Sequence, residues 1–245
     1  MSRINVIIPS RNSRIFIAGA IKSVLSARHL IVSITCIDDG STDGTAEEIQ
    51  ALGLPEDFLR IKRIEAGSPS VARNTGLTCL PNEGDLILFL DADDLVPDQI
   101  LEHHLRALDA NHEVSASIGL VEYFDEQDKA HLRPAAGART QMSAVPQLGS
   151  ILFKRRVFDQ IGYFDTRLVQ GEDTDLLFRF FEAGLIFEFL DLAALYYRRH
   201  AHNLTNDLAG KRRGMFQSLK FAGERRKINP ALGKIPERFW SRGMK

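Results

Sequence analysis

The feature that most constrains the fold of this chain is an apolar run that ends in three carboxylates. Residues 86–90 read Leu-Ile-Leu-Phe-Leu, and Asp91, Asp93 and Asp94 follow directly. Such a continuous apolar run is typical of a strand buried on both faces of a sheet. Because unpaired acids are costly to bury, they belong at the carboxyl end of that strand, where open α/β sheets bind ligands. Hard cations prefer oxygen ligands, so the pattern predicts a Mg²⁺ or Mn²⁺ site; the alternative is an acidic loop that caps the next helix.

The first 110 residues alternate between predicted strands and predicted helices. Largely apolar segments that suit strands occur at residues 4–8, 32–37 and 86–90, and Leu59, Ile61 and Ile64 suggest a further strand. After each run, apolar side chains recur at helical spacing. Pro69 and Pro97 each suit the first turn of such a helix. The alternation predicts an α/β fold, with a mostly parallel sheet flanked by helices.

The pattern changes after residue 111. Residues 114–120 alternate between apolar and small or polar side chains, which predicts a half-exposed strand. Residues 125–147 have no periodicity and are expected to form a loop that borders a substrate pocket. The remaining predicted elements are a strand and a helix within 149–161, a helix carrying Leu176 to Phe181, and two strands at 186–190 and 194–197.

The composition is that of a globular domain. A chain of 245 residues with 44% hydrophobic content can bury a substantial core. Its two cysteines exclude a disulfide scaffold. No apolar run approaches the roughly 20 residues that span a bilayer, and the first residues lack a signal-peptide core. We therefore expect a cytoplasmic protein, with peripheral membrane contact as an alternative.

Basic residues are concentrated at the end of the chain. Residues 211–245 hold 11 Lys or Arg against 2 acids, a net charge of +9, whereas the rest of the chain carries −10. Such asymmetry is typical of a surface that meets an anionic partner, although a solvated basic helix has the same pattern. A helix bearing Phe216 and Leu219 is expected to pack back on the domain or to form a homodimer, with an anionic membrane as a further alternative. Nucleic acid is not expected as a partner.

A second predicted strand also ends in acids. Asp38 and Asp39 follow residues 32–37 and are succeeded by Gly40 and small hydroxyl residues. Neighbouring parallel strands would bring Asp38 and Asp39 to the same sheet edge as Asp91 and Asp93. One acidic pair then suits a metal, and the other suits hydrogen bonds to a nucleotide base or ribose.

Six motifs together resemble the family 2 glycosyltransferases with the GT-A fold, over about residues 4–205. In order they are Val-Ile-Ile-Pro-Ser-Arg-Asn at 6–12, Asp-Asp-Gly-Ser-Thr-Asp at 38–43, Pro-Ser-Val-Ala-Arg-Asn at 69–74, Phe-Leu-Asp-Ala-Asp-Asp at 89–94, Gly-Ser-Ile-Leu-Phe at 149–153, and Gly-Tyr-Phe-Asp at 162–165 with Gly-Glu-Asp at 171–173. The resemblance implies a GT-A-like, Rossmann-type sheet with a small antiparallel portion and a C-terminal helical extension. It divides the chain into a glycosyltransferase domain at 1–205, with a nucleotide-binding half at 1–110 and an acceptor half at 111–205, and a basic helical extension at 206–245.

The resemblance also implies an activity. A sugar would move with inversion from a nucleotide-diphosphate donor, with a UDP-sugar favoured, to a saccharide, lipid-linked or peptide acceptor. The residues that it assigns to the donor nucleotide are Pro9, Ser10, Asn12, Asp38, Asp39, Arg73, Asp91 and Ala92.

A divalent cation, Mn²⁺ or Mg²⁺, is implied beside the donor diphosphate. Its candidate ligands are two of Asp91, Asp93 and Asp94, joined by His200 or His202. A cation there would stabilise the charge on the leaving diphosphate. The neighbouring arginines at 198 and 199 suit a phosphate.

Glu172 and Asp173 match the family's acidic pair at the start of a helix, which implies that Asp173 is the general base. Direct displacement needs one carboxylate within hydrogen-bond reach of the acceptor hydroxyl. The alternative is that the pair only complements the charge of the helix N-terminus. His103 and His104, on the helix after the first acidic turn, are expected to be solvated.

Two other functions were weighed. A sugar-phosphate nucleotidylyltransferase has a similar sheet, but it requires a glycine-rich phosphate loop after the first strand, and residues 9–12 contain no glycine. A non-catalytic nucleotide-sugar-binding protein is the second alternative, and the intact Asp93 and Asp173 argue against it.

Overall fold

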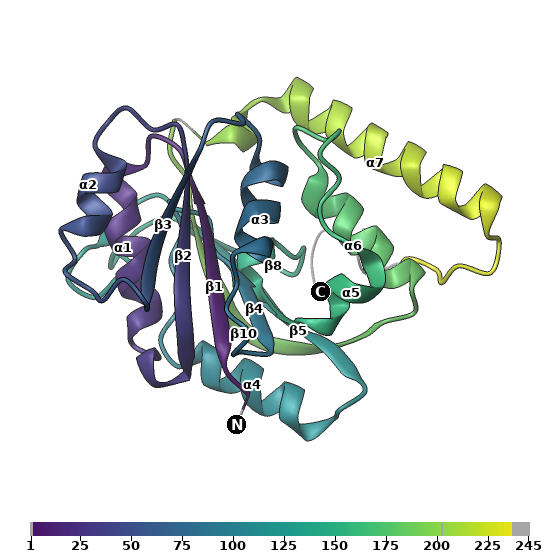
Figure 1. Ribbon diagram of the computed structural model, residues 1–245, viewed down its shortest axis with the longest axis horizontal. Helices are drawn as coiled ribbons and strands as arrows, with labels where there is room; N and C mark the ends of the chain where they lie inside the picture. Colours follow the sequence, from purple (N-terminus) through teal and green to yellow (C-terminus); the bar gives the residue numbers. More distant parts are fainter. Residues whose placement is uncertain (1, 202, 237–245) are drawn as a thin grey trace.

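A mixed β-sheet runs through the molecule and has helices on both faces (Figure 1). The computed structural model describes residues 2–201 and 203–236. Within these residues the sheet has eight strands, in the order β10-β5-β9-β4-β1-β2-β3 with β8 paired to β5. Their bounds are β1 Ile4–Ser10, β2 Ile31–Asp39, β3 Leu59–Ile64, β4 Leu86–Phe89, β5 Val114–Phe124, β8 Thr140–Ser143, β9 Ile151–Lys154 and β10 Ile186–Arg198.

The half of the sheet formed by β1 to β4 is parallel. β1 pairs with both β2 and β4, and β2 pairs with β3. In the other half, β9 is antiparallel to β4 and β5, while β10 is parallel to β5. The predicted α/β class, with a mostly parallel sheet and a small antiparallel portion, is confirmed. Because β1 lies between β2 and β4, the two strands that end in acids share a sheet edge without being neighbours.

The helices cover the two faces through separate apolar cores. One core contains Ile8, Leu88 and side chains of α1, α2 and α4; the other contains Ile7, Phe89 and side chains of α3, α5 and α6. Successive residues of β1 and β4 therefore point into opposite cores, as the period of a strand requires. The helix bounds are α1 Arg14–Leu25, α2 Thr45–Gln50, α3 Pro69–Thr78, α4 Ile100–Ala110, α5 Arg156–Ile161, α6 Glu172–Glu182 and α7 Leu208–Ile228.

Several expectations for local structure are wrong. β5 is buried along most of its length because α4 packs on one face of it and the core of α5 and α6 on the other, so its small and polar residues lie inside the molecule. Residues 186–198 form one strand, whose pairing with β5 is irregular, instead of two. The expected loop at 125–147 contains β8 and a two-stranded sheet of β6 (Gln127–Asp128) and β7 (Arg133–Pro134). The helix expected from Pro97 begins at Ile100.

The C-terminal extension folds back on the domain through α7. This helix lies beside α6 on the outside of the molecule (Figure 1). Its buried residues are all small, namely Gly210, Gly214, Ser218 and Ala222. In the part of the chain that the structure describes, no helix has both the length and the apolarity to cross a membrane.

Candidate active site

The carboxyl end of β2 holds two buried acids that organise the neighbouring loops. The carboxylate of Asp39 accepts hydrogen bonds from the backbone N–H groups of Ala66 and Gly67, at 2.7 and 3.0 Å, and of Ser68, at 3.0 Å. The carboxylate of Asp38 accepts one from the N–H of Ser41 at 3.1 Å. Asp39 therefore holds the loop that leads into α3.

The loop after β1 is joined to the loop after β2 through Asn12. Its backbone N–H donates to Ser41 Oγ at 2.9 Å, and its side-chain oxygen accepts from the N–H of Thr42 at 3.0 Å. Ser10 is buried and donates from Oγ to the carbonyl of Ile37 at 3.3 Å. Pro9, at the end of β1, pairs in register with Ile37. The residues predicted to bind the nucleotide at 9–12 and 38–39 thus form one continuous sheet edge.

Arg73 joins the acidic turn after β4 to the acidic pair of α6. It projects from α3, is 5% exposed, and donates to Asp91 Oδ1 at 2.7 Å and to Glu172 Oε1 at 2.6 Å. Burial alone would lower the pKa of Arg73, but the charges of Asp91 and Glu172 raise it, so the guanidinium stays charged. The pairing of Arg73 with Glu172 offsets the cost of burying these two groups, while Asp91 is 44% exposed.

Glu172 and Asp173 open α6 but lie in different surroundings. Glu172 is 7% exposed, and burial raises its pKa to about 7, against the opposing charge of Arg73 and with a contribution from Asp173. Asp173 is only partly buried, and its carboxylate accepts a hydrogen bond from the N–H of Thr174 at 2.6 Å. Asp173 is therefore the more accessible carboxylate of the pair, whereas Glu172 is held by Arg73.

The three acids after β4 have different partners. Asp91 meets Arg73, Asp93 Oδ2 lies 2.9 Å from His200 Nε2, and Asp94 accepts the backbone N–H of Arg198 at 2.9 Å. Burial raises the pKa of Asp94 well above its usual value, as do the charges of Asp93 and Asp91. Asp94 is thus engaged with the backbone of β10, whereas Asp93 faces His200. Ala92 is buried between them.

The candidate metal ligands near Asp93 suit a cation that also binds the substrate. Among residues 2–201 and 203–236, no three acidic, histidine or cysteine side chains are grouped closely enough to enclose a metal ion by themselves. Asp93 and His200 form a pair of one oxygen and one nitrogen ligand, and Mg²⁺-type ions usually complete their coordination with phosphate oxygens and water. This pair fits such an ion. His202, the other candidate, lies outside the described residues.

Other polar residues complete this corner of the site. Asn203 donates to Asp93 Oδ2 at 3.4 Å and to the carbonyl of Arg198 at 3.0 Å. The guanidinium of Arg198 donates to the carbonyl of Asp93 at 2.8 Å and to the side chain of Gln127 at 2.7 Å. Asn203 and Gln127 were not expected, and their positions after a strand and in an irregular loop carried no specific signal. Arg198 supports the backbone of the acidic turn.

His104 corrects the expectation for residues 103–104. It is 1% exposed, its Nδ1 lies 2.9 Å from Ser117 Oγ, and burial lowers its pKa to about 4. The ring is therefore neutral and belongs to the core. Its helical spacing from Leu101 and Leu108, both buried, was the signal that would have placed it there.

This sheet and its acidic edge are those of the GT-A fold. Residues 5–168 match the sequence model described as Glycosyl transferase family 2, so the chain belongs to that family. Family membership sets aside the nucleotidylyltransferase alternative.

Solved structures and relatives resemble the chain at low identity. TarS 1–349 of S. aureus, solved in complex with UDP, superposes with a TM-score of 0.67 at 18% identity, covering 96% of this chain and 67% of that TarS fragment. An uncharacterized glycosyltransferase of Rickettsia bellii is 28% identical over 75% of this chain, and the minor teichoic acid biosynthesis protein GgaA of Bacillus subtilis is 29% identical over 52%. The matches cover 28% and 29% of those two proteins, so the chain spans less than a third of their length.

Proposed function

We propose that this chain transfers a sugar from a UDP-sugar to a hydroxyl group of its acceptor by a single displacement that inverts the anomeric carbon. The observation that carries this proposal is the bridge from Asp91 through Arg73 to Glu172. It joins Asp91, predicted to lie beside the sugar donor, to the acidic pair Glu172-Asp173, predicted to contain the general base. Both reactants would therefore meet at one edge of the sheet. The structures of S. aureus TarS with UDP and with UDP-GlcNAc support a UDP-sugar as donor.

Asp173 is proposed as the general base. It is the more exposed acid of the pair, and it opens α6 next to the anchored Glu172. Its carboxylate takes the proton of the acceptor hydroxyl as the hydroxyl oxygen bonds to the anomeric carbon and the bond to the diphosphate breaks. One positioned base contributes about 10²- to 10⁴-fold to such a reaction. Glu172 is proposed as a positioning residue, because Arg73 already occupies its carboxylate.

Asp93 and His200 are proposed to hold Mn²⁺ or Mg²⁺ beside the diphosphate. Such a cation supplies Lewis-acid stabilisation of the charge on the leaving group. Asp39, Asp38 and Asn12 would border the nucleoside, since they line the loops at the carboxyl ends of β1 and β2. The acceptor is proposed to be a saccharide, a lipid-linked saccharide or a peptide hydroxyl.

A thermal-shift experiment tests the cation and the donor. UDP with Mn²⁺ is expected to raise the melting temperature, whereas UDP in a chelator raises it much less, because the diphosphate then lacks its counter-charge. Asp93→Ala and His200→Ala are expected to remove the Mn²⁺-dependent part. Equal stabilisation by UDP in chelator would remove the metal from the proposal.

A screen of nucleotide sugars tests the donor class. Slow hydrolysis of each sugar nucleotide in the absence of acceptor is measured with Mn²⁺ present. A UDP-sugar is expected to be hydrolysed fastest. Preference for a GDP-, ADP- or TDP-sugar would overturn the assignment of uracil as the nucleobase of the donor, and the reaction class would still stand.

A further inference from the structure

The inner face of α7 meets the backbone just before the acidic pair. Gly214 lies so close to Gln170 that an added Cβ would overlap its carbonyl group. An added Cβ on Gly171 would lie 2.7 Å from the carbonyl carbon of Gly214. The two backbones touch with no side chain between them, so a displacement of α7 at this point is passed directly to residues 170–171.

A hydrogen bond fixes the same contact. Ser218 is completely buried, and its Oγ lies 2.8 Å from the carbonyl oxygen of Gly171 and 2.9 Å from that of Gly214. Gly171 is the residue before Glu172 and has a φ of +84°, a conformation that glycine adopts without strain. The start of α6 is therefore held by a turn and by α7 together.

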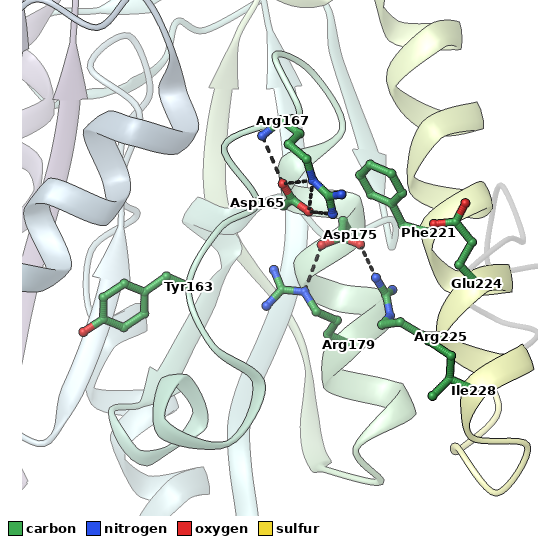
Figure 2. A pocket seen from close by; sticks show the side chains of 9 residues that line it. All are labelled: Tyr163, Asp165, Arg167, Asp175, Arg179, Phe221, Glu224, Arg225 and Ile228. Atoms are coloured by element: carbon green, nitrogen blue, oxygen red, sulfur yellow. Dashed lines mark hydrogen bonds and ion pairs between the residues drawn. The ribbon is translucent and has the colours of Figure 1, made fainter.

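Ion pairs attach α7 further along α6. Arg225 donates to Asp175 Oδ1 at 2.8 Å and to Glu182 Oε2 at 2.6 Å, and Asp175 also accepts from Arg179 at 2.9 Å. Figure 2 shows Arg225 and Arg179 approaching Asp175 from either side. A pocket of about 390 Å³ is lined by residues of both helices, among them Arg179, Phe221 and Ile228. Beyond Gly214 and Ser218, ion pairs thus contribute to the contact between α6 and α7.

We propose that α7 positions the catalytic base, with Gly214 and Ser218 as the positioning residues. The inference rests on the proposed role of Asp173. A displacement of about 1 Å in a catalytic group can cost about 100-fold in rate. The close backbone contact two to three residues before Asp173 is the route by which α7 would control it.

Gly214→Ala tests this proposal against Gly223→Ala. Both variants add one methyl group to the same helix, but nothing lies within 4 Å of a Cβ at Gly223. Gly214→Ala is expected to lower kcat by about 10- to 100-fold while UDP affinity and the number of UDP sites stay unchanged. Gly223→Ala is expected to keep the kcat of the parent protein.

Ser218→Ala provides the second measurement, since it removes the hydroxyl group without adding an atom. Its kcat is expected to fall by a smaller factor, again with UDP binding intact. Equal kcat values for all three variants, in an enzyme that Asp173→Asn inactivates, would overturn the positioning role alone. If Asp173→Asn is itself fully active, the proposed function fails instead.

The outer face of α7 carries a second, independent pattern. Leu208, Phe216 and Leu219 are exposed there, at 65%, 72% and 44%. At about 100° per residue, Phe216 lies opposite Gly214 and Ser218, and Leu208 and Leu219 lie within about 80° of Phe216. The exposed charged side chains beside Phe216 are mostly basic, namely Arg212, Arg213, Lys220 and Lys227. Two exposed acids lie near them, Asp207 at 3.8 Å from Arg213 and Glu224 at 4.0 Å from Lys220.

We infer that this outer face binds an anionic phospholipid surface. A bilayer provides both anionic headgroups for the four cations and an apolar layer for Phe216. A second copy of the same face would bring like charges together, which disfavours a symmetric dimer through α7. Nucleic acid would satisfy the charges but not the exposed apolar side chains.

Vesicle sedimentation tests this inference with the whole chain. Binding to equimolar phosphatidylglycerol and phosphatidylcholine vesicles is expected, with little binding to pure phosphatidylcholine. Arg212→Glu combined with Lys220→Glu is expected to weaken binding by more than about 10-fold, and Phe216→Ser is expected to weaken it at the same net charge. Lys62→Glu, a reversal on exposed β3, is the control. Equal binding to both vesicles, or wild-type binding by both α7 variants, would overturn the inference.

Discussion

The acids at the end of β2 and the acids at the start of α6 are held in different ways. Asp38 and Asp39 bind backbone N–H groups of Ser41 and of residues 66–68, all within 30 positions of the chain. Glu172 instead meets Arg73, which is 99 positions away. The acids at the end of β2, which are proposed to border the nucleotide, are therefore held by nearby turns. The acidic pair Glu172-Asp173 depends on α3 and α7, which are distant in sequence.

The largest expected difference between the two regions concerns catalysis. Asp173→Asn removes the proposed base without changing the shape of the side chain, so kcat is expected to fall by about 10²- to 10⁴-fold. Titration calorimetry with UDP and Mn²⁺ is expected to give the affinity of the parent protein. Asp165→Asn is the matched control, because Asp165 pairs with the exposed Arg167 in a turn. Near-normal turnover of Asp173→Asn would remove it from the mechanism.

Arg73→Gln tests how far the acidic pair Glu172-Asp173 depends on Arg73, which is distant in sequence. The substitution leaves Glu172 and Asp91 without their shared cation, and breaking a buried ion pair costs about 3–5 kcal/mol. The free energy of unfolding in urea is expected to fall by that order. Arg139→Gln, which removes a pair with Asp125 from an arginine whose side chain is 92% exposed, is expected to cost less than about 1 kcal/mol. Similar losses for both variants would show that the bridge is energetically unimportant.

The raised pKa of Glu172 predicts a pH dependence of stability. Burial raises this pKa from 4.5 to about 7, so between those values the folded chain binds more protons at Glu172 than the unfolded chain. The contribution of Glu172 to the free energy of unfolding is therefore largest below pH 4.5 and is lost as the pH rises through 7, by on the order of 1–3 kcal/mol.

Urea unfolding at several pH values measures that contribution. Glu172→Gln cannot ionise, so the stability difference between this variant and the parent protein is expected to change across the window from pH 4.5 to 7. A difference that stays constant with pH would contradict the assignment. The same stability difference is measured for Asp38→Asn, at the end of β2. It shows whether a change with pH is specific to Glu172.

The smallest expected effect is at the end of β2, among the residues proposed to border the nucleotide. Asp39→Asn replaces one carboxylate oxygen by an NH₂ group that faces the backbone donors of residues 66–68. The loop before α3 is expected to loosen, and the KM for the donor to rise about 10-fold, or about 1.4 kcal/mol, with a smaller change in kcat. Asp57→Asn, at an exposed position, is the control. A fall in kcat as large as that of Asp173→Asn would contradict the separation of roles.

Much of the first half of the fold was predictable because its signals are local. The apolar runs of β2 and β4 identify strands, and the acids that end them must lie at the sheet edge. The prediction for β5, a half-exposed strand, was wrong. Its alternation suggested one exposed face, but Ser115 and Ser117 are buried there because α4 packs against β5. Burial of that kind depends on partners that a local pattern does not contain.

The candidate site divides in the same way. The sequence by itself determined which acids end β2 and β4 and which acids open α6, since residue type and periodicity act over a few positions. Only the tertiary structure decided that Arg73 bridges Asp91 and Glu172, that Asp93 faces His200, and that Gly214 touches the segment before Asp173. These contacts arise when β1 separates the two acid-tipped strands and α7 folds back on α6. Their geometry depends on the packing of remote elements, which residue spacing along the chain does not specify.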